Sequence, residues 1–356
     1  MNPARSQQDL QETFAGVLLG TAVGDTLGLP AEGMSRQRIH LRWRGEWRHR
    51  FFFSRGMMSD DTEHTLFVAQ ALLTHPDDPL AFQRCLAWKL RLWLLGAPAG
   101  IGLATLRAIF KMWMGISPSR SGVWSAGNGP AMRSAVIGVY FATDPGKRRA
   151  FVSASTRLTH TDPKAETAAL AVAEAAAWAV NQDEPIGQWL THLPGLGRDE
   201  EWLAICHKLV DALAAGKSVE EFADSLGLKI GVTGYAYHSV PVALCAWMRH
   251  RDDFRKALEA ALNCGGDTDS VGAIVGALLG AKVGKQGIPS GMIGGIWEWP
   301  RSVLFMERVA SRLAEQRSAS KPLGPVRYFW PGLIPRNVLF LCVVLAHGFR
   351  RLAPPY

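Results

Sequence analysis

The feature that most constrains the fold is a pair of glycine series with four-residue spacing. They are Gly16, Gly20 and Gly24 in AGVLLGTAVGD and Gly272, Gly276 and Gly280 in SVGAIVGALLGA. This spacing stacks residues on one face of an α-helix, and a glycine face lets another backbone approach closely. In a membrane it would indicate helix dimerisation, but Asp25 follows the first series and the second is too short to span. We therefore expect two closely packed core helices, which could bring the acids beside them together.

Much of the remaining chain favours helices. Several segments are rich in Ala and Leu and poor in alternating β-branched residues, which is typical of helix. They are residues 61–74, 80–96, 164–181, 200–215, 238–250 and 270–282. Asp162 is placed to cap one of them, and Pro163 stands at its first position, where a missing N–H costs nothing. We predict a single all-α bundle in residues 1–316, with a Ser/Gly/Pro-rich loop at 116–130 that is long enough to be functional.

Positive charge is concentrated in two stretches. The net charge is +8, yet residues 316–356 contain no acid. The basic residues of this tail are Arg317, Lys321, Arg327, Arg336, Arg350 and Arg351. The second stretch, residues 36–55, holds Arg36, Arg38, Arg42, Arg44, Arg48, Arg50 and Arg55 against one acid, Glu46. Its partial alternation around RGE predicts a short hairpin or an extended loop.

Cysteine usage and the N-terminal segment bear on the compartment. The five cysteines are widely spaced, and no two form a C-x-x-C pair, so they indicate neither a disulfide framework nor a zinc site. The segment MNPARSQQDLQETF lacks the apolar core of a signal peptide, and no uncharged apolar run approaches the roughly 20 residues that span a bilayer. We therefore expect a cytoplasmic protein.

Carboxylates and hydroxyls gather in three places. GLPAEG contains Glu32, SDDTEH begins with Ser59, Asp60 and Asp61, and NCGGDTDSVG contains Asp267, Asp269 and Ser270. A capping box of Asp60 and Glu63 would explain the second cluster taken alone. Both helix starts, however, carry one acid beyond the cap, and like charges pack unfavourably unless a cation compensates them. Oxygen ligands without His or Cys suit Mg²⁺ or Mn²⁺ better than Zn²⁺, so we expect a magnesium-type site.

Five ordered blocks resemble the ADP-ribosylglycohydrolase family, which includes the dinitrogenase-reductase-activating glycohydrolases. The blocks are GVLLGTAVGDTLGLPAEG, SDDTEHTLFVAQALL, SAGNGPAMRSAVIG, LTHTDPKAETAALAVA and NCGGDTDSVGAIVGALLGA, within roughly residues 13–300. The resemblance implies an all-α orthogonal bundle with two Mg²⁺ or Mn²⁺ ions and an activity that removes ADP-ribose from modified acceptors. The implied metal ligands are Ser59, Asp60, Asp61, Asp267, Asp269 and Ser270, with Glu32 beside them. Many members have Thr where this chain has Ser59 and Ser270, and the hydroxyl oxygen is kept.

The resemblance also implies substrate contacts. Ser125, Gly127, Asn128, Gly129 and Met132 fall in the family loop that wraps the diphosphate and the proximal ribose. Glycine allows close backbone approach there, and exposed N–H groups suit phosphate oxygens; an ordinary turn is the alternative. His160 corresponds to a ligand-contacting histidine of the family, although a lone His before a helix is more often a surface residue. Tyr235 is a candidate for packing on the ligand, with core packing as the alternative.

Catalytic roles follow from the chemistry of the bond. Cleavage at C1 of ribose passes through an oxocarbenium-like state and needs a positioned water, a base and stabilisation of developing charge. Metal ions can orient ribose hydroxyls and lower the pKa of a bound water. We assign Asp60 and Asp269 to metal holding and water activation. Glu32 is assigned to general acid/base catalysis or to gating of the site, two roles that the sequence does not separate.

Three functions from different classes fit the sequence. The first is a metal-dependent ADP-ribosylglycohydrolase that acts on an ADP-ribosylated protein, with nucleic acid or a small molecule as alternative acceptors and ADP-ribose as product. The second is a non-catalytic ADP-ribose-binding or structural member, as some crystallins of the superfamily are; the intact acids argue against it. The third is nucleic-acid binding by residues 36–55, where cations would hold phosphates and aromatics would stack on bases. A solvated basic loop is the alternative there.

The position of this arginine stretch suggests a further role. Because it lies between Glu32 and Asp60, we expect Arg42, Arg44 and Arg48 to border the site and steer anionic substrate.

Residues 317–356 form an extension beyond the resemblance. After the Pro/Gly-rich KPLGPVRYFWPGLIPRN come nine apolar residues, VLFLCVVLA, too short to cross a bilayer. They predict a final helix docked on the bundle through Leu339, Cys342 and Val343. The alternative is a peripheral anchor, in which Phe329, Trp330 and the apolar run enter a membrane interface while basic side chains meet anionic lipid or an acidic partner.

Overall fold

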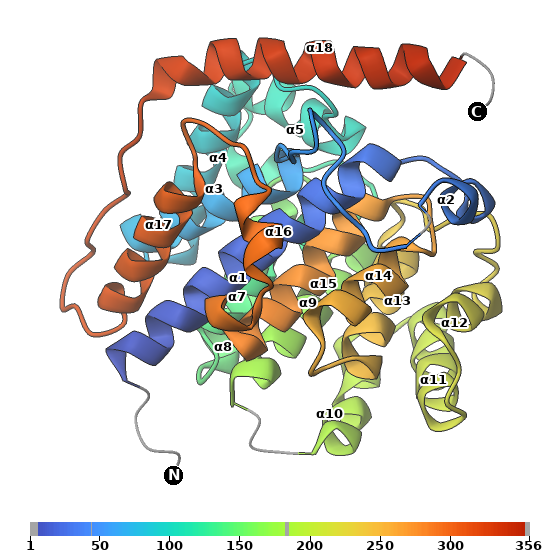
Figure 1. The fold of residues 1–356 in the computed structure, drawn as a ribbon. Coiled ribbons are helices and arrows are strands. Elements are labelled where there is room, and N and C mark those ends of the chain that lie inside the picture. The colour runs from blue at the N-terminus through green and yellow to red at the C-terminus, as the bar shows by residue number, and fades with distance from the viewer. Residues whose placement is uncertain (1–5, 44, 182–184, 353–356) are drawn as a thin grey trace.

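Two antiparallel helices whose glycines meet form the centre of the molecule. The computed structural model describes residues 6–43, 45–181 and 185–352, and in it α1 (Gln7–Gly28) packs along α15 (Thr268–Val283) (Figure 1). The facing pairs are Gly16 and Gly280, Gly20 and Gly276, Gly24 and Gly272, and Gly28 and Thr268. A Cβ atom on Gly20 would lie 2.1 Å from the carbonyl oxygen of Gly276, so no side chain fits there. The expected close packing is confirmed, and Gly28 extends the glycine seam by one more turn.

The described residues form eighteen α-helices and no β-strand, which confirms the predicted all-α class. Besides α1 and α15, the helices are α2 (Arg36–Arg42), α3 (Asp60–Thr74), α4 (Pro79–Leu95), α5 (Leu103–Trp113), α6 (Gly129–Met132), α7 (Ala135–Tyr140), α8 (Pro145–Arg157), α9 (Pro163–Asn181), α10 (Ile186–His192), α11 (Glu200–Ala214), α12 (Val219–Ser225), α13 (Ala236–Arg249), α14 (Phe254–Leu262), α16 (Ser290–Gly294), α17 (Val303–Gln316) and α18 (Leu333–Leu352). The 3₁₀ helices are η1 (Leu29–Ala31), η2 (Pro118–Arg120), η3 (Leu193–Leu196), η4 (Lys285–Gly287) and η5 (Trp330–Gly332).

The other helices enclose the glycine seam on both sides. Helices α9, α13 and α14 pack on α15, while α3 and α17 pack on α1. One continuous hydrophobic core extends from Phe14 in α1 to Ala314 in α17. All six predicted helical segments are present, and Asp162 accepts a hydrogen bond from the Lys164 N–H at 2.9 Å at the start of α9.

The prediction for residues 36–55 is wrong in its first part, where α2 forms instead of a hairpin strand. Ser35 caps this helix by accepting the Arg38 N–H at 3.4 Å, and Ile39 buries its side chain in the core, so a helical turn outweighs the local alternation. A tight turn in this stretch lies at Phe52–Arg55. The turn predicted around RGE includes Arg44, which is outside the described residues.

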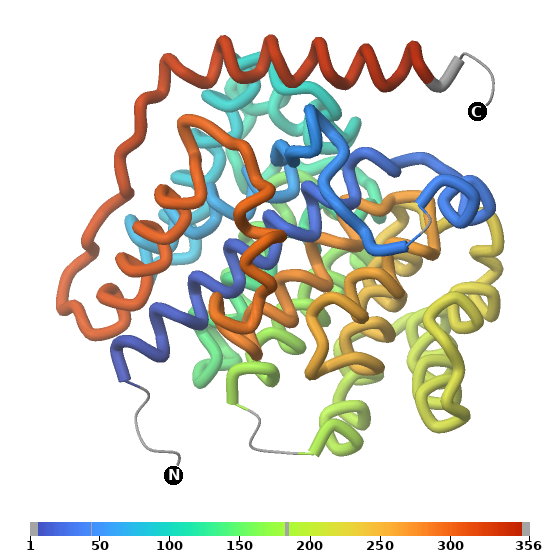
Figure 2. The backbone as a smooth tube through the Cα atoms, in the orientation of Figure 1, coloured from blue at the N-terminus to red at the C-terminus, as the bar shows by residue number. Residues whose placement is uncertain are grey.

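The tail returns along the outside of the bundle to a long final helix. Residues 317–329, which follow α17, run along the side of the molecule, and α18 then lies across the top of the view (Figure 2). Arg336 anchors α18 through Glu298, with contacts of 2.8 and 2.7 Å, and Asn337 Nδ2 donates to the Gly96 carbonyl at 2.7 Å. Phe340 and Val343 pack into a small apolar cluster that includes Phe51.

The docked helix is therefore present, but it differs from the prediction in length and in contacts. Val343 is buried and Leu339 packs on the small cluster, as expected, whereas Cys342 is exposed. Among the described residues, two segments are long and apolar enough to cross a membrane by length and composition alone. They are Gln7–Ala31, whose most apolar part is buried in the bundle, and Trp330–Arg350, whose most apolar part is only one-third buried. The nine apolar residues VLFLCVVLA are only part of this helix, which is longer than the sequence analysis expected.

Candidate metal and substrate site

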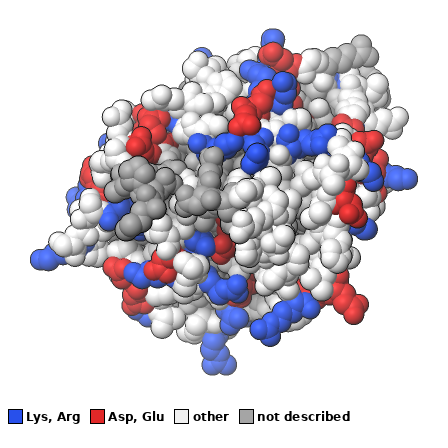
Figure 3. Space-filling model, turned by 90° about the horizontal axis from the view of Figure 1, so that it is seen from below, with Lys and Arg blue, Asp and Glu red and all other residues white. Residues whose placement is uncertain are grey.

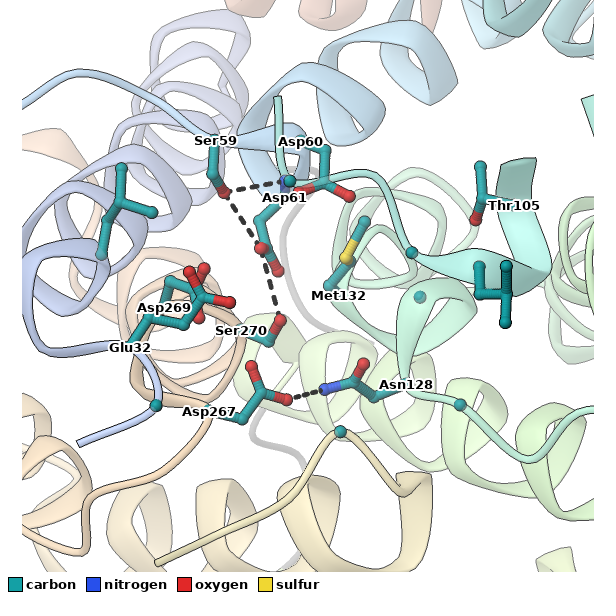
Figure 4. A pocket seen from close by; sticks show the side chains of 18 of the residues that line it. Glu32, Ser59, Asp60, Asp61, Thr105, Asn128, Met132, Asp267, Asp269 and Ser270 are labelled. Carbon is teal, nitrogen blue, oxygen red and sulfur yellow. Dashed lines mark hydrogen bonds between the residues drawn. The ribbon is translucent and has the colours of Figure 1, made fainter. Parts of the chain in front are cut away.

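A cavity of about 530 Å³ lies where the glycine seam ends. The C-terminal end of α1 and the N-terminal ends of α3 and α15 meet there, because the antiparallel seam places the end of one central helix beside the start of the other (Figure 4). Every predicted site residue except Tyr235 lines this cavity. Its volume is within the range of small-molecule and cofactor sites.

Asp61 is the point on which two hydroxyls converge. Ser59 Oγ donates to Asp61 Oδ2 at 3.1 Å, and Ser270 Oγ donates to the same oxygen at 3.3 Å (Figure 4). The other carboxylate oxygen, Oδ1, is buried without a hydrogen-bond partner, and so is Oδ1 of Asp269. A buried, unpaired carboxylate oxygen is costly unless something compensates it.

The capping box of Asp60 and Glu63, the alternative explanation of the acids at α3, does not form. Ser59 is the N-cap residue, and its Oγ accepts the Asp61 N–H at 3.2 Å. Glu63 points into the core instead, where it pairs with Arg301 and accepts from Trp93 Nε1 at 2.5 Å. Asp60 is left to face the cavity.

Asp25 is a residue that the sequence analysis missed. It is fully buried in α1, and it accepts the Ser59 N–H at 3.0 Å, the Thr62 N–H at 3.2 Å and the Thr62 hydroxyl at 2.5 Å. Burial raises the pKa of this carboxyl to about 7, against the opposing effect of these hydrogen bonds. The signal in the sequence was an acid directly after Gly24, in the part of α1 from Thr13 to Gly28 that is otherwise free of charge.

The double glycine before α15 is explained by three loops that meet there. Gly265 and Gly266 have φ values of 71° and 83°, and a Cβ atom on Gly266 would lie 1.8 Å from the Val232 carbonyl oxygen. Gly266 donates its N–H to the Met34 carbonyl at 2.8 Å, and Gly33 donates to the Gly266 carbonyl at 2.7 Å. These bonds hold the Glu32 loop against the start of α15.

Asp267 occupies the N-cap position of α15, yet its side chain caps nothing. It accepts a hydrogen bond from Asn128 Nδ2 at 2.6 Å instead, so it joins the acidic cluster to the Ser125–Gly129 loop (Figure 4). The acids at this helix start therefore exceed the needs of capping, as the sequence indicated.

The carboxylates of the cluster repel one another. Burial, followed by the charge of Asp25, raises the pKa of Asp60 well above its ordinary value. Burial also raises the pKa of Asp61 and of Asp269 strongly, with the next largest contributions from Asp60 and Glu32 respectively. Burial raises the pKa of Asp267 as well. Each shift shows that negative charge in this cluster is poorly compensated by the protein.

The donor set fits a hard divalent cation by its chemistry. It consists of carboxylate and hydroxyl oxygens, two of them buried without a hydrogen-bond partner. Among the described residues, no three His, Cys, Asp or Glu side chains stand ready as a metal-binding group. A cation held here would draw the carboxylates closer together and would use the serine hydroxyls as well.

His160 packs under the glycine-rich loop on the opposite wall. It is 4 % exposed, so it is not the surface residue that its sequence context suggests. A Cβ atom on Gly127 would lie 3.0 Å from His160 Nε2, and one on Gly129 would lie 3.3 Å from Cε1, so the loop rests directly on the imidazole. Burial, with the charge of Arg133, lowers the pKa of His160 to about 3.

A buried chain of hydrogen bonds connects this neutral imidazole to Arg133. Arg133 Nη2 donates to Thr159 Oγ1 at 2.9 Å, and the same oxygen is hydrogen-bonded to His160 Nδ1 at 2.8 Å. These contacts orient the ring so that Nε2 lies next to Gly127.

Two sequence-based expectations fall outside the cavity. Tyr235 does not line it; its hydroxyl accepts from Lys164 Nζ at 2.9 Å and donates to Glu201 at 3.0 Å. The arginine stretch does not border it either, since no described residue of 36–55 is in its lining, and Arg44 lies outside the described residues. At the start of α2, the Arg36 N–H donates to the Ile230 carbonyl at 2.8 Å.

Part of the cavity wall comes from segments that the sequence analysis did not assign. Thr105 and the preceding residues at the start of α5 form one side. Phe340 and Val344 of α18 form another, so the C-terminal extension contributes to the site.

Comparisons with known proteins agree with this geometry. A sequence model of the ADP-ribosylglycohydrolase family matches residues 6–322. An uncharacterised protein of Archaeoglobus fulgidus is 31% identical over 318 residues, which is 86% of this chain and 97% of that protein. The ADP-ribosyl-[dinitrogen reductase] glycohydrolase of Rhodospirillum rubrum is 27% identical over 286 residues, 78% of this chain and 88% of that protein.

A solved structure shows the same fold. It is described as an ADP-ribosylglycohydrolase-related protein complex and superposes with a TM-score of 0.65 at 26% sequence identity. The match covers 87% of this chain and 99% of the other. The family match ends before α18 begins.

Proposed function

The chain belongs to the ADP-ribosylglycohydrolase family, and from this membership we propose that it is a hydrolase that depends on Mg²⁺ or Mn²⁺ and removes ADP-ribose from modified protein side chains. Hydrolysis of ADP-ribose linkages follows from the family and its named relatives. The metal dependence and the protein acceptor are the parts that we propose. Because the Rhodospirillum rubrum relative is named for a protein substrate, a protein is the acceptor to test first.

One observation carries the proposal. A buried cluster of oxygen donors from α1, α3 and α15 faces a glycine-rich loop across a single cavity. The cluster suits one or two hard cations, while the loop offers close backbone approach to a diphosphate. Asn128 connects the two sides through its bond to Asp267.

The residues of the cavity have different roles in the proposed cleavage of the glycosidic bond. We propose that Asp60 and Asp269 hold the metal and orient the attacking water, with Ser59, Asp61, Asp267 and Ser270 completing the ligand set. A bound cation would lower the pKa of that water and orient the ribose hydroxyls. Glu32 lies at the exposed rim, and its charge is the largest neighbouring contribution to the raised pKa of Asp269. A carboxylate at that position can exchange a proton with water or with the leaving group.

The opposite wall would position the ADP-ribose. The backbone of Gly127 and Gly129 can approach the diphosphate closely. Met132 lines the cavity beside this loop. Nε2 of the neutral His160 ring lies beside that loop and can form a hydrogen bond to the bound ligand. We also propose that the enzyme works in the cytoplasm, where its five free cysteines would stay reduced.

The proposal is tested with a panel of ADP-ribosylated acceptors. Arginine- and serine-modified proteins, modified nucleic acid and a modified small guanidine are incubated with metal-stripped enzyme, with and without restored Mg²⁺ or Mn²⁺, and free ADP-ribose is measured. We expect release from a protein only after metal is restored, and none from the Asp269→Asn variant. Equal turnover in the metal-stripped sample would exclude metal dependence. Release of ADP-ribose from modified nucleic acid alone would show that the acceptor is a nucleic acid and not a protein.

A further inference from the structure

The outward face of α18 is a continuous apolar stripe. Ile334, Val338, Leu341, Leu345 and Phe349 are between 41% and 68% exposed. Their spacing of three and four residues places them on one side of the helix. Among the described residues of α18, no charged side chain lies between Arg336 and Arg350.

The stripe lies on the side of α18 that faces away from the bundle. The inward face of α18 is already docked through Arg336, Asn337, Phe340 and Val343. The face of the molecule opposite α18 carries acidic and basic side chains among neutral ones, as is usual for a solvated surface (Figure 3). A long exposed apolar stripe therefore marks α18 as an interaction surface.

The two ends of α18 add features that a membrane surface recognises. Phe329 and Trp330, at the N-terminal end, are 60% and 40% exposed, and aromatic side chains favour the membrane interface. At the other end, Arg350 shares a pocket of about 300 Å³ with Arg42 and Arg50. The remaining lining comes from Pro30, Met34, Trp43 and His347, so its described residues include no acid.

The arginine pocket is a built feature of the fold. Arg50 stacks over the Trp43 ring at 5.2 Å and donates to the Arg42 carbonyl at 3.3 Å. His347 Nε2 bonds to the Phe51 carbonyl at 2.8 Å, which ties the end of α18 to the loop that carries Arg50. Clustered guanidinium groups favour a phosphate group as ligand.

The docked geometry favours a helix that lies on a membrane over one that crosses it. A spanning α18 would have to leave its partners on the bundle and carry Arg336 into the lipid, although this arginine now pairs with Glu298 at 2.7 Å. An amphipathic helix in the interface keeps these contacts and buries only its outer face.

We propose that α18 docks the protein on an anionic membrane, with its outer apolar stripe in the lipid interface and the arginine pocket on a phospholipid phosphate. The inference does not depend on the reaction catalysed. It places the cavity wall formed by Phe340 and Val344 directly behind the membrane-facing stripe.

Vesicle sedimentation tests the stripe. Full-length protein is mixed with phosphatidylcholine vesicles that contain or lack phosphatidylglycerol. We expect binding to the anionic vesicles, weakened at least about ten-fold in the V338Q/L341Q/L345Q variant because its apolar contacts are lost. The matched control is L203Q/V210Q, which changes two exposed apolar residues of α11 and should bind like the unaltered protein. Circular dichroism checks that all variants are folded.

A second pair of variants tests the arginine pocket. R50Q/R350Q should lose much of the preference for anionic over neutral vesicles, whereas R149Q/R198Q, at exposed positions outside the pocket, should keep it. Equal binding by the stripe variant and the unaltered protein would overturn the proposal, as would resistance to alkaline carbonate extraction, which indicates a spanning helix. A dimer in solution that the stripe substitutions dissociate, without vesicle binding, would assign the stripe to a second copy of the chain and also overturn it.

Discussion

Asp25 and Thr62 are joined by two hydrogen bonds to one atom. Asp25 Oδ2 accepts the Thr62 N–H at 3.2 Å and the Thr62 hydroxyl at 2.5 Å, and both residues are buried. The carboxylate at the end of α1 thus holds the first turn of α3, which carries Asp60 and Asp61. Asp25 is a positioning residue: it contacts the ligand-bearing backbone and does not line the cavity.

Replacing Asp25 with Asn should therefore weaken both stability and metal binding. The amide oxygen of the new side chain could keep the Oδ2 contacts, but its NH₂ group would then face the Ser59 N–H that now donates to Oδ1 at 3.1 Å. Two donors would oppose each other in the core, at a cost of about 1–3 kcal/mol in the free energy of unfolding. Urea denaturation measures the first effect and titration calorimetry with Mn²⁺ measures the second. Thr21→Val, which removes a buried hydroxyl elsewhere in α1, should leave the metal affinity unchanged. Equal Mn²⁺ affinity in D25N and the unaltered protein would refute the positioning role.

The glycine seam should not tolerate even a methyl group. Gly20→Ala would place Cβ 2.1 Å from the Gly276 carbonyl oxygen, so α1 and α15 must move apart, at a cost of about 3 kcal/mol or more. Gly187→Ala in α10 is the control, because nothing lies within 4 Å of its added Cβ, and it should be neutral or slightly stabilising. Thermal unfolding compares the two variants directly. Similar unfolding midpoints would contradict the close backbone packing of α1 against α15.

Mg²⁺ should reverse the order of stability of the Asp269→Asn variant and the unaltered protein. Without metal, Asp269→Asn should be more stable than the unaltered protein, because it removes a charge from a cluster that repels itself. With Mg²⁺ at about a hundred times its dissociation constant, the unaltered protein should gain about 2.7 kcal/mol and the variant much less. Asp252→Asn, an exposed acid paired with Lys282, should gain as much as the unaltered protein. An unchanged order of stability would argue against a metal at Asp269.

Acid should destabilise the protein partly through His160. Its pKa falls from 6.5 to about 3 on folding, so between these values the unfolded chain binds a proton that the folded protein does not. The resulting loss begins as the pH falls through 6.5 and reaches about 2 kcal/mol at pH 5. His160→Asn should therefore lose less stability between pH 7 and pH 5, while the exposed His207→Asn should behave like the unaltered protein. Equal losses in all three proteins, measured by urea denaturation, would show that His160 titrates normally.

Features that depend on neighbouring residues could be predicted from the sequence. Asp162 and Pro163 define the start of α9 through contacts within that turn, and the glycine spacing predicts a close helix contact because only glycine permits it. The acids at the starts of α3 and α15 were expected to meet because each helix start carries one acid more than capping needs, and a shared cation would compensate the charge.

Features decided by distant partners could not be predicted in this way. Glu63 stands where a capping box would use it, but its partner is Arg301, 238 residues away. Asp25 has its donors 34 and 37 residues later, and no local pattern identifies them. The direction taken by α2 likewise depends on Ile230 and Gly266, which a reading of residues 36–55 does not include.

The pairing of α1 with α15 has a consequence for the order in which the protein can be assembled during translation. From Thr13 to Gly28 every residue of α1 is buried, yet its main partner helix ends only at Val283. This apolar segment therefore lacks its main partner while the chain between the two helices is synthesised, and contacts so distant in sequence form slowly. A helix that is synthesised long before its main partner is enclosed late, so the nascent chain should depend on chaperones until α15 has left the ribosome.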